Sequence, residues 1–438
     1  MSDIKIEFTD NILINTSGLA KIGQFLNDTQ VFSKINRVSK IKKNSGIISD
    51  YDMIKTQIAL ICLGKTDFEA VEQYRNDKFF KKALKLKRVP SSPSLRQRIE
   101  TYGKEMCEVI REINIELLKD YFIGESVQIG GQSYIILDSD VTPMDNSGSK
   151  KELVELTYRK FNGYSPMMSY AGTSGFMINN ELRSGSSHTN CEGTLDYFGT
   201  TISLLKQLSD EPVLAIMDSG NDDRALVRQL IGNGADCLIK RNLRREPAEK
   251  YINYCKEFAA ERGMIKSIYP GCRKYYVNWE LEVQDIMVPI SVVMTEKTTD
   301  SKGQTFMMPE IELEVYWNTL KLAAEQAEEY YHQHGTSEQY HSEFKTDLDM
   351  ERLPSGKFSS NYIYMLFGML SFNLLRITGK SLMETGLVPG KRGKRLRIRT
   401  ILQNVMYMAG QFISHARSTA LKLYKEYLWT PSFAMIMK

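Results

Sequence analysis

The feature that most constrains the fold is an alternation of strand-like and helix-like segments that begins at residue 126. Apolar, β-branched runs occur at SYIILDSDVT, SPMMSYA, GFMINNELR, PVLAIMDSG and ADCLIKRN. The amphipathic segments TLDYFGTTISLLKQL and DDRALVRQLIGNG lie between the later runs and have the spacing of helices. The predicted order is three strands, a helix, a strand, a helix and a strand, which indicates an α/β core.

Two of these predicted strands end in aspartate, and the element order is that of a ribonuclease H-like core. Asp218 closes one strand, while the first strand offers Asp138 and Asp140, which point to the same face because side chains alternate along a strand. A carboxylate there is costly unless it has a partner at the sheet rim, where open α/β sheets bind ligands. Asp140 and Asp218 are therefore either turn formers or metal ligands, since D-S-G-N-D is also good turn chemistry.

The flanking segments have other patterns. Residues 1–125 have helical spacing, and RVPSSPSLRQR reads as a turn that leads into a helix with serine at its N-cap. Residues 263–317 are rich in Val, Ile, Tyr and Trp and predict an antiparallel β unit inserted into the core, after which the helical pattern resumes. At 438 residues, the chain is long enough for a main domain with such additions.

Basic residues are gathered in two short runs, although the formal net charge is only +4. Each run alone is often just a solvated face. Two of them in one chain with a carboxylate core indicate a polyanionic partner. The runs are Lys78, Lys81, Lys82, Lys85, Lys87 and Arg88, and Lys391, Arg392, Lys394, Arg395, Arg397 and Arg399.

Several classes of protein fit the sequence poorly. It has no apolar run of membrane-spanning length and no signal-peptide pattern at its start, so we expect a cytoplasmic protein without a membrane partner. The six cysteines are widely spaced and lack zinc-ligand spacing, which predicts reduced thiols. No G-x-S-x-G motif or Cys and His grouping suggests a covalent nucleophile.

Chemistry-bearing residues recur at helical spacing in the segment 320–345. If this segment is one helix, Tyr331, His334, Glu338 and Lys345 lie within roughly 60° of one another at 100° per residue, and Glu343 lies off that stripe. Such a stripe is a poor hydrophobic face. It suits either an exposed charged helix or a site that holds a metal and a phosphate.

The same residues resemble a known family. The pattern Y-x-x-R-x-x-x-E-x-x-x-x-x-x-K is that of the YREK-type DDE transposases of bacterial insertion sequences, with His334 here in place of arginine. LDSDVT and IMDSGN resemble the family's two aspartate motifs, although Met217 stands where a polar or basic residue is usual. LRSGSSH, the stretch from DLDMERL to NLLR and the stretch from KRLRIRT to ALKL resemble the insertion-sequence 1380 family, so the resemblance covers nearly the whole chain.

The resemblance implies an activity and a catalytic triad. Asp140, Asp218 and Glu338 would hold two Mg²⁺ ions, with Mn²⁺ able to replace them, and the LDSDVT motif favours Asp140 over Asp138. Two such ions about 4 Å apart stabilise both the attacking and the leaving oxygen of a phosphodiester. The expected activity is cut-and-paste transposition, in which the enzyme nicks DNA at terminal inverted repeats and transfers the strand to target DNA.

The resemblance also implies DNA contacts and an assembly. Tyr331, His334 and Lys345 would contact phosphates near the transposon end, and a histidine there lacks the bidentate fork of arginine. Trp279 is either a core residue or a stacking surface for an extruded base. Arg96 and Arg98 are candidates for reading bases in a groove. Further candidates for phosphate contacts are Lys391, Arg392, Lys394 and Arg395.

We therefore predict four regions. They are a helical DNA-binding region at 1–125, a ribonuclease H-like catalytic core at 126–262 and 318–380, an inserted β subdomain at 263–317, and a basic helical region for DNA binding or dimerisation at 381–438. The expected form is a homodimer on double-stranded DNA, associated with a bacterial nucleoid. The alternatives are a catalytically inactive DNA-binding repressor and a simple Mg²⁺-dependent nuclease.

Overall fold

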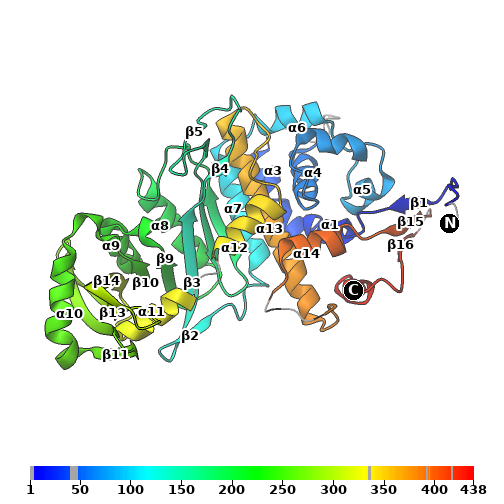
Figure 1. The fold of residues 1–438 in the computed structure, drawn as a ribbon. Coiled ribbons are helices and arrows are strands. Elements are labelled where there is room, and N and C mark those ends of the chain that lie inside the picture. The colour runs from blue at the N-terminus through cyan, green and yellow to red at the C-terminus, as the bar shows by residue number, and fades with distance from the viewer. Residues whose placement is uncertain (1–3, 40–47, 334–336, 391–392, 394, 416–417) are drawn as a thin grey trace. The chain divides into compact units, whose positions relative to one another are not determined.

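The computed structural model describes residues 4–39, 48–333, 337–390, 393, 395–415 and 418–438. The chain forms two compact units (Figure 1). The sheet unit comprises residues 122–143 and 155–341, and the helical unit comprises residues 1–121, 144–154 and 342–438.

The sheet unit is built on a mixed sheet of ten strands. Five of them occupy the strand segments predicted between residues 126 and 242, in the spatial order β8, β7, β3, β9, β10. β9 runs parallel to both β3 and β10, whereas β7 runs antiparallel to β3 and to β8. These strands are β3 (Gln132–Val141), β7 (Met167–Ala171), β8 (Phe176–Glu181), β9 (Val213–Met217) and β10 (Ala235–Lys240).

The predicted helices of this region cover the sheet at their expected positions. α8 (Thr194–Leu205) contacts β8, and α9 (Arg224–Gly232) contacts β10. α9 begins at Asp223, whose carboxylate accepts hydrogen bonds from two N–H groups of the first turn. The fold is therefore mixed α/β, as the alternation of segments predicted.

The predicted antiparallel β unit continues the same sheet. Its last strand, β14 (Thr305–Asn318), pairs antiparallel with β10, and β13 (Ile286–Thr299), β12 (Cys272–Val283) and β11 (Met264–Tyr269) follow outward. α10 (Ala248–Arg262) precedes these strands and packs on them. The β unit and the five core strands thus share one hydrogen-bonded sheet.

Helix α11 (Ala324–Gln333) packs against one face of this sheet. Its Ala324 and Ala327 lie in a buried cluster with Ile136 of β3, Leu214 of β9 and Leu238 of β10. Small alanine side chains allow the helix to lie close to the strands. α11 is therefore fixed over the middle of the sheet, next to the ends of β3 and β9. The remaining short elements of the sheet unit are β2 (Val127–Ile129), β5 (Glu155–Leu156), β6 (Asn162–Tyr164), η2 (Ser219–Asn221) and η3 (Leu243–Arg245).

The helical unit joins the two ends of the chain around one long helix. α13 (Phe358–Glu384) is buried along most of its length and contacts α4 (Asp50–Ile61) and α7 (Lys104–Leu118) (Figure 1). α6 (Ser92–Ile99) begins at the predicted serine cap, Ser91, whose hydroxyl accepts from Ser94 N–H. Its other elements are α1 (Leu19–Leu26), α2 (Thr29–Phe32), α3 (Ile35–Val38), η1 (Phe68–Tyr74), α5 (Lys78–Ala83), β4 (Met144–Asp145), η4 (Glu343–Asp347), α14 (Ile398–Ile401), η5 (Leu402–Met406) and α15 (Thr430–Ile436).

We had predicted helical regions at both ends of the chain. The structure also contains strands there. β1 (Ile12–Ile14), β15 (Gly410–Ser414) and β16 (Thr419–Leu423) form a small antiparallel sheet of three strands. Each strand is short, and the sheet joins the two ends of the chain, so its pairing could not be read from local periodicity.

Two expectations about composition can be compared with the described residues. All six cysteines are free thiols, and all but Cys191 are buried. Within the part of the chain that the structure describes, no helix is both long and apolar enough to cross a membrane.

Candidate active site

Three aspartates follow buried apolar residues on one face of two neighbouring strands. Ile136 on β3 and Ile216 on β9 belong to the buried cluster under α11. Since side chains two residues apart share a face, Asp138 and Asp140 lie on the face of Ile136, and Asp218 is two residues beyond Ile216. β3 and β9 are parallel neighbours, so their carboxyl ends meet at one edge of the sheet. The strand geometry thus gathers these carboxylates below α11.

The carboxylates are close enough to affect one another's charge. Burial raises the pKa of Asp140 to about 7, and the negative charges of Asp218 and Asp138 add to this rise. Backbone N–H of Val141, which donates to the Asp140 carboxylate at 2.7 Å, and the positive charge of Arg159 oppose it. A carboxyl group crowded in this way favours the bound cation that would relieve the repulsion.

Tyr331 on α11 lies near the aspartates. It is half-buried, and its ring packs 4.9 Å from that of Tyr316. Burial raises the pKa of its hydroxyl, and the charges of Asp218, Asp138 and Asp140 contribute to the rise. The structure therefore brings together Tyr331 and the aspartates that the sequence had singled out.

Asn221 holds the loop that carries Asp218, and sequence reasoning missed it. Asp218 caps the short helix η2 and accepts from Gly220 N–H at 2.9 Å. The Asn221 side-chain amide donates to Asp218 Oδ1 at 3.2 Å and to the Ser139 carbonyl oxygen at 3.1 Å. Because Asn221 is fully buried, it ties the end of β9 to β3. The only signal in the sequence was the turn chemistry of D-S-G-N-D.

The segment predicted to carry the third carboxylate has a more complicated backbone than one helix. Glu338 is exposed in α12 (Ser337–Ser342), and no contact among the described residues joins it to the aspartates. His334 lies outside the described residues. Lys345 follows in the π-helical turn η4 and forms an ion pair with Glu351 at 3.5 Å. The roles of Glu338 and Lys345 stay predictions.

Glu343, which lies off the predicted helical stripe, is a buried carboxylate paired with arginines. Its carboxylate is fully buried in the helical unit and bonds to Arg376 and Arg395, each at 2.6 Å. Arg397 is held in the same way by Asp347 at 2.8 Å. Part of the second basic run is therefore bound to buried carboxylates. Lys391, Arg392 and Lys394 lie outside the described residues.

The other predicted DNA contacts also have partners within the protein. Arg96 is half-exposed and pairs with Glu69. Arg98 is largely buried and pairs with Asp50 at 2.7 Å. The roles of both arginines in DNA binding stay predictions.

Trp279 lies against helix α10. Its ring stacks on Tyr254 with centroids 4.2 Å apart and an angle of 11° between the planes, and the Lys250 ammonium lies 4.8 Å from its centre. The same ring lines a hollow of about 470 Å³ together with Arg262 and Lys321. Both interpretations of Trp279, core residue and stacking surface, are compatible with a ring that is half-buried.

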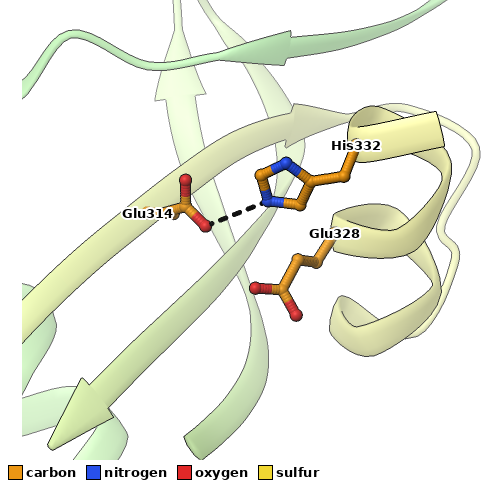
Figure 2. A group of neighbouring side chains, drawn as sticks. All are labelled: Glu314, Glu328 and His332. Atoms are coloured by element: carbon orange, nitrogen blue, oxygen red, sulfur yellow. Dashed lines mark hydrogen bonds and ion pairs between the residues drawn. The ribbon is translucent and has the colours of Figure 1, made fainter. Parts of the chain in front are cut away.

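A second group of possible metal ligands lies beside Tyr331. Glu314 on β14 and Glu328 and His332 on α11 point toward one another, with ligand atoms within 4.8 Å (Figure 2). Glu314 pairs with Lys240, and Glu328 pairs with Lys274 at 2.6 Å and accepts from the Tyr276 hydroxyl. Because Lys240 and Lys274 already balance the two carboxylates, this group has little unpaired negative charge to offer a cation.

Comparison with known proteins identifies the family. The family model described as "Transposase DDE domain group 1" matches residues 1–438. Among solved structures, the chain is similar to piggyBac transposase in a synaptic complex with hairpin DNA, with 11% identity over 96% of this chain and 81% of that chain, and a TM-score of 0.45. No curated protein matches the sequence. The chain therefore belongs to the transposase DDE family.

Proposed function

We propose that this member of the transposase DDE family cuts DNA at the terminal inverted repeats of an insertion sequence and joins the cut ends to target DNA. Asp140, Asp218 and Glu338 are its catalytic carboxylates. The observation that carries the proposal is the meeting of Asp140 and Asp218 at one sheet edge, where burial and the charge of Asp218 raise the pKa of Asp140 to about 7. Asp138 is the alternative ligand on the first strand.

The donor set fits Mg²⁺. Carboxylate oxygens are the ligands that Mg²⁺ prefers, and it keeps its other positions for water and phosphate. When bound, divalent ions activate the attacking water or 3′-hydroxyl and stabilise charge on the leaving oxygen. Asp140 and Asp218 would hold the ions, Asn221 fixes the orientation of the Asp218 carboxylate, and the Tyr331 hydroxyl, which lies near the aspartates, would contact a phosphate.

A ribonuclease H-like core is part of the proposal. It is supported by the strand order β8, β7, β3, β9, β10 and by the parallel run of β3, β9 and β10. The YREK group and the insertion-sequence 1380 family are proposed from the motifs around Asp140, Asp218 and Tyr331. A homodimer on paired DNA ends, in a bacterial cell and near its nucleoid, completes this interpretation.

The first basic run supports DNA binding by the helical unit. All six of its side chains are exposed, on α5 and the residues after it. A groove of about 790 Å³ lies between α5 and the strands β15 and β16, and its cationic lining residues are Lys78, Lys81, Lys82 and Lys85. None of the described residues that line this groove is a carboxylate. Such a surface suits the phosphates of the inverted repeats, and binding there should weaken steeply with salt.

The test uses duplexes that carry the inverted repeats and their flanks, incubated in Mg²⁺ with target plasmid. Wild type should cut at the repeat boundary and join the end to plasmid. Asp140→Asn, Asp218→Asn and Glu338→Gln should bind the duplex and leave it uncut. Binding without cleavage by wild type would favour an inactive repressor, and cleavage without joining would favour a nuclease. Cleavage by Asp140→Asn but not by Asp138→Asn would move the first metal ligand to Asp138.

A further inference from the structure

A small hairpin projects three side chains that the catalytic triad does not use. β5 and β6 pair through Glu155 with Gly163, and Thr157 N–H donates to the Phe161 carbonyl oxygen at 2.8 Å to close the turn. Lys160 has a φ of +68°, which bends the chain sharply at the tip. Tyr158, Arg159 and Lys160 are therefore presented together, and all three are exposed.

The tip of this hairpin lies at the aspartate cluster. The Tyr158 hydroxyl donates to the carbonyl oxygen of Val141, the residue after Asp140, at 3.4 Å. The Arg159 guanidinium lies 5.9 Å from the centre of the Tyr158 ring, so the hydrogen bond of Tyr158 to Val141 holds this charge near the end of β3. Among the described residues, Arg159 forms no ion pair. Its charge faces solvent beside the carboxylates.

The segment LRSGSSH anchors the base of the hairpin. The Glu155 carboxylate accepts from Ser186 N–H at 3.3 Å and from the Ser186 hydroxyl, and the Ser165 hydroxyl donates to the Gly185 carbonyl oxygen at 2.8 Å. A Cβ at position 185 would lie 2.2 Å from the Glu155 carbonyl oxygen, so only glycine allows this approach. The hairpin base is therefore tightly packed against this segment.

The same segment continues to the loop that carries Asp218. The Asn190 side-chain amide donates to the Gly220 carbonyl oxygen at 3.2 Å. A Cβ on Gly220 would lie 3.2 Å from the Thr189 hydroxyl, which shows how close the two loops are. One stretch of chain thus holds both the hairpin and the Asp218 loop, which fixes the tip relative to the carboxylates.

We propose that the hairpin tip is a DNA-backbone contact of the active site, in which Arg159 binds a phosphate of the strand being cut and Tyr158 packs against the adjoining sugar. The inference rests on the proposed function, because it needs a DNA strand at the aspartates. A guanidinium binds phosphate through two parallel N–H groups and so fixes position as well as charge. Phosphate contacts of this kind set the register of a strand relative to catalytic groups.

The test measures binding of the end duplex without divalent metal, as a function of salt, for wild type, Arg159→Ala and Arg159→Lys. Neutralising one phosphate contact should lower affinity about tenfold and reduce the slope of log K against log salt by about 0.9. Arg159→Lys should keep the slope and lose part of the single-turnover cleavage rate in Mg²⁺. Lys302→Ala, which removes an exposed cation at the turn between β13 and β14, should change neither quantity.

Duplexes with a single uncharged methylphosphonate locate the contact. Wild type should lose affinity when the linkage beside the cleavage point is neutral, and Arg159→Ala should be insensitive to that same linkage. Equal salt slopes and equal methylphosphonate profiles for wild type and Arg159→Ala would overturn the hairpin contact. A wild type that binds the ends without cutting them would end the transposase proposal, whereas these binding comparisons would still decide the role of Arg159. If wild type binds no DNA, both proposals are wrong.

Discussion

Removal of the Asp140 charge should stabilise the folded protein when no metal is present. A carboxyl group with a pKa of about 7 in the folded protein and 3.8 in the unfolded chain destabilises the fold by about 4 kcal/mol above pH 7. The folded state binds the proton more tightly, so the loss begins near pH 4 and is complete above pH 7. At pH 5 the same group costs only about 1.5 kcal/mol.

Asp140→Asn removes this pH dependence because an amide has the same shape and does not titrate. We expect the variant to exceed wild type in free energy of unfolding at pH 8, and the advantage to shrink by about 2–3 kcal/mol at pH 5. Urea unfolding in EDTA measures this difference by tryptophan fluorescence, since Trp279 and Trp317 both lie in the sheet unit. Asp210→Asn removes an exposed aspartate of the same unit and serves as the control.

Addition of Mg²⁺ should narrow the stability advantage of Asp140→Asn over wild type at pH 8. A ligand that binds only the folded state stabilises it by about 2.7 kcal/mol at one hundred times its Kd. Wild type should gain this stability, and Asp140→Asn should gain little. An equal advantage of Asp140→Asn at pH 5 and pH 8, or an equal response of both proteins to Mg²⁺, would refute the idea that these carboxylates crowd one another around a cation site.

Three further predictions concern neighbouring contacts. Asn221→Ala should slow Mg²⁺-dependent cleavage about 10- to 100-fold, a range seen for residues that orient metal ligands. Its DNA affinity in EDTA should be unchanged. An unaltered cleavage rate would contradict the role of Asn221 in holding Asp218. Glu343→Gln should lower the free energy of unfolding by about 3–5 kcal/mol because it leaves Arg376 buried without its counter-charge. Urea unfolding measures this loss. An unchanged free energy of unfolding would argue that the ion pair is not formed. Gly185→Ala should cost stability and slow cleavage, because its Cβ would lie 2.2 Å from a backbone oxygen; a variant as stable and active as wild type in the same assays would show that the hairpin base can move.

The parts of the site that were predicted from the sequence depend on short-range patterns. An apolar strand that ends in aspartate can be read within ten residues, and the helices between such strands indicate that the strands run parallel. These patterns made Asp140 and Asp218 candidates for turn formers or metal ligands at the sheet rim, and the resemblance to the family favoured metal ligands. Asn221 and the hairpin tip escaped prediction because their roles depend on which loops meet in space.

The helical stripe shows where a regular periodicity stops being valid. It assumed 100° per residue from 320 to 345, whereas the described backbone changes from the α-helices α11 and α12 to the π-helical turn η4. A π-helix bonds residue i to i+5, so each residue advances the side chain by a smaller angle. The direction of Lys345 relative to Tyr331 therefore does not follow from the wheel, although both were identified through it.

A run of charges in a sequence likewise cannot show which charges remain available to a partner. In the first run, lysines and arginine alternate with buried residues such as Phe79 and Leu86, and all of the cations are exposed. In the second run, Arg395 neutralises Glu343, a carboxylate more than fifty residues away in the chain. Desolvated charges require such partners, and that requirement outweighs attraction to a distant polyanion. Replacement of Arg395 should therefore lower the free energy of unfolding more than it lowers DNA affinity. Replacement of Lys81 should lower DNA affinity more than it lowers the free energy of unfolding.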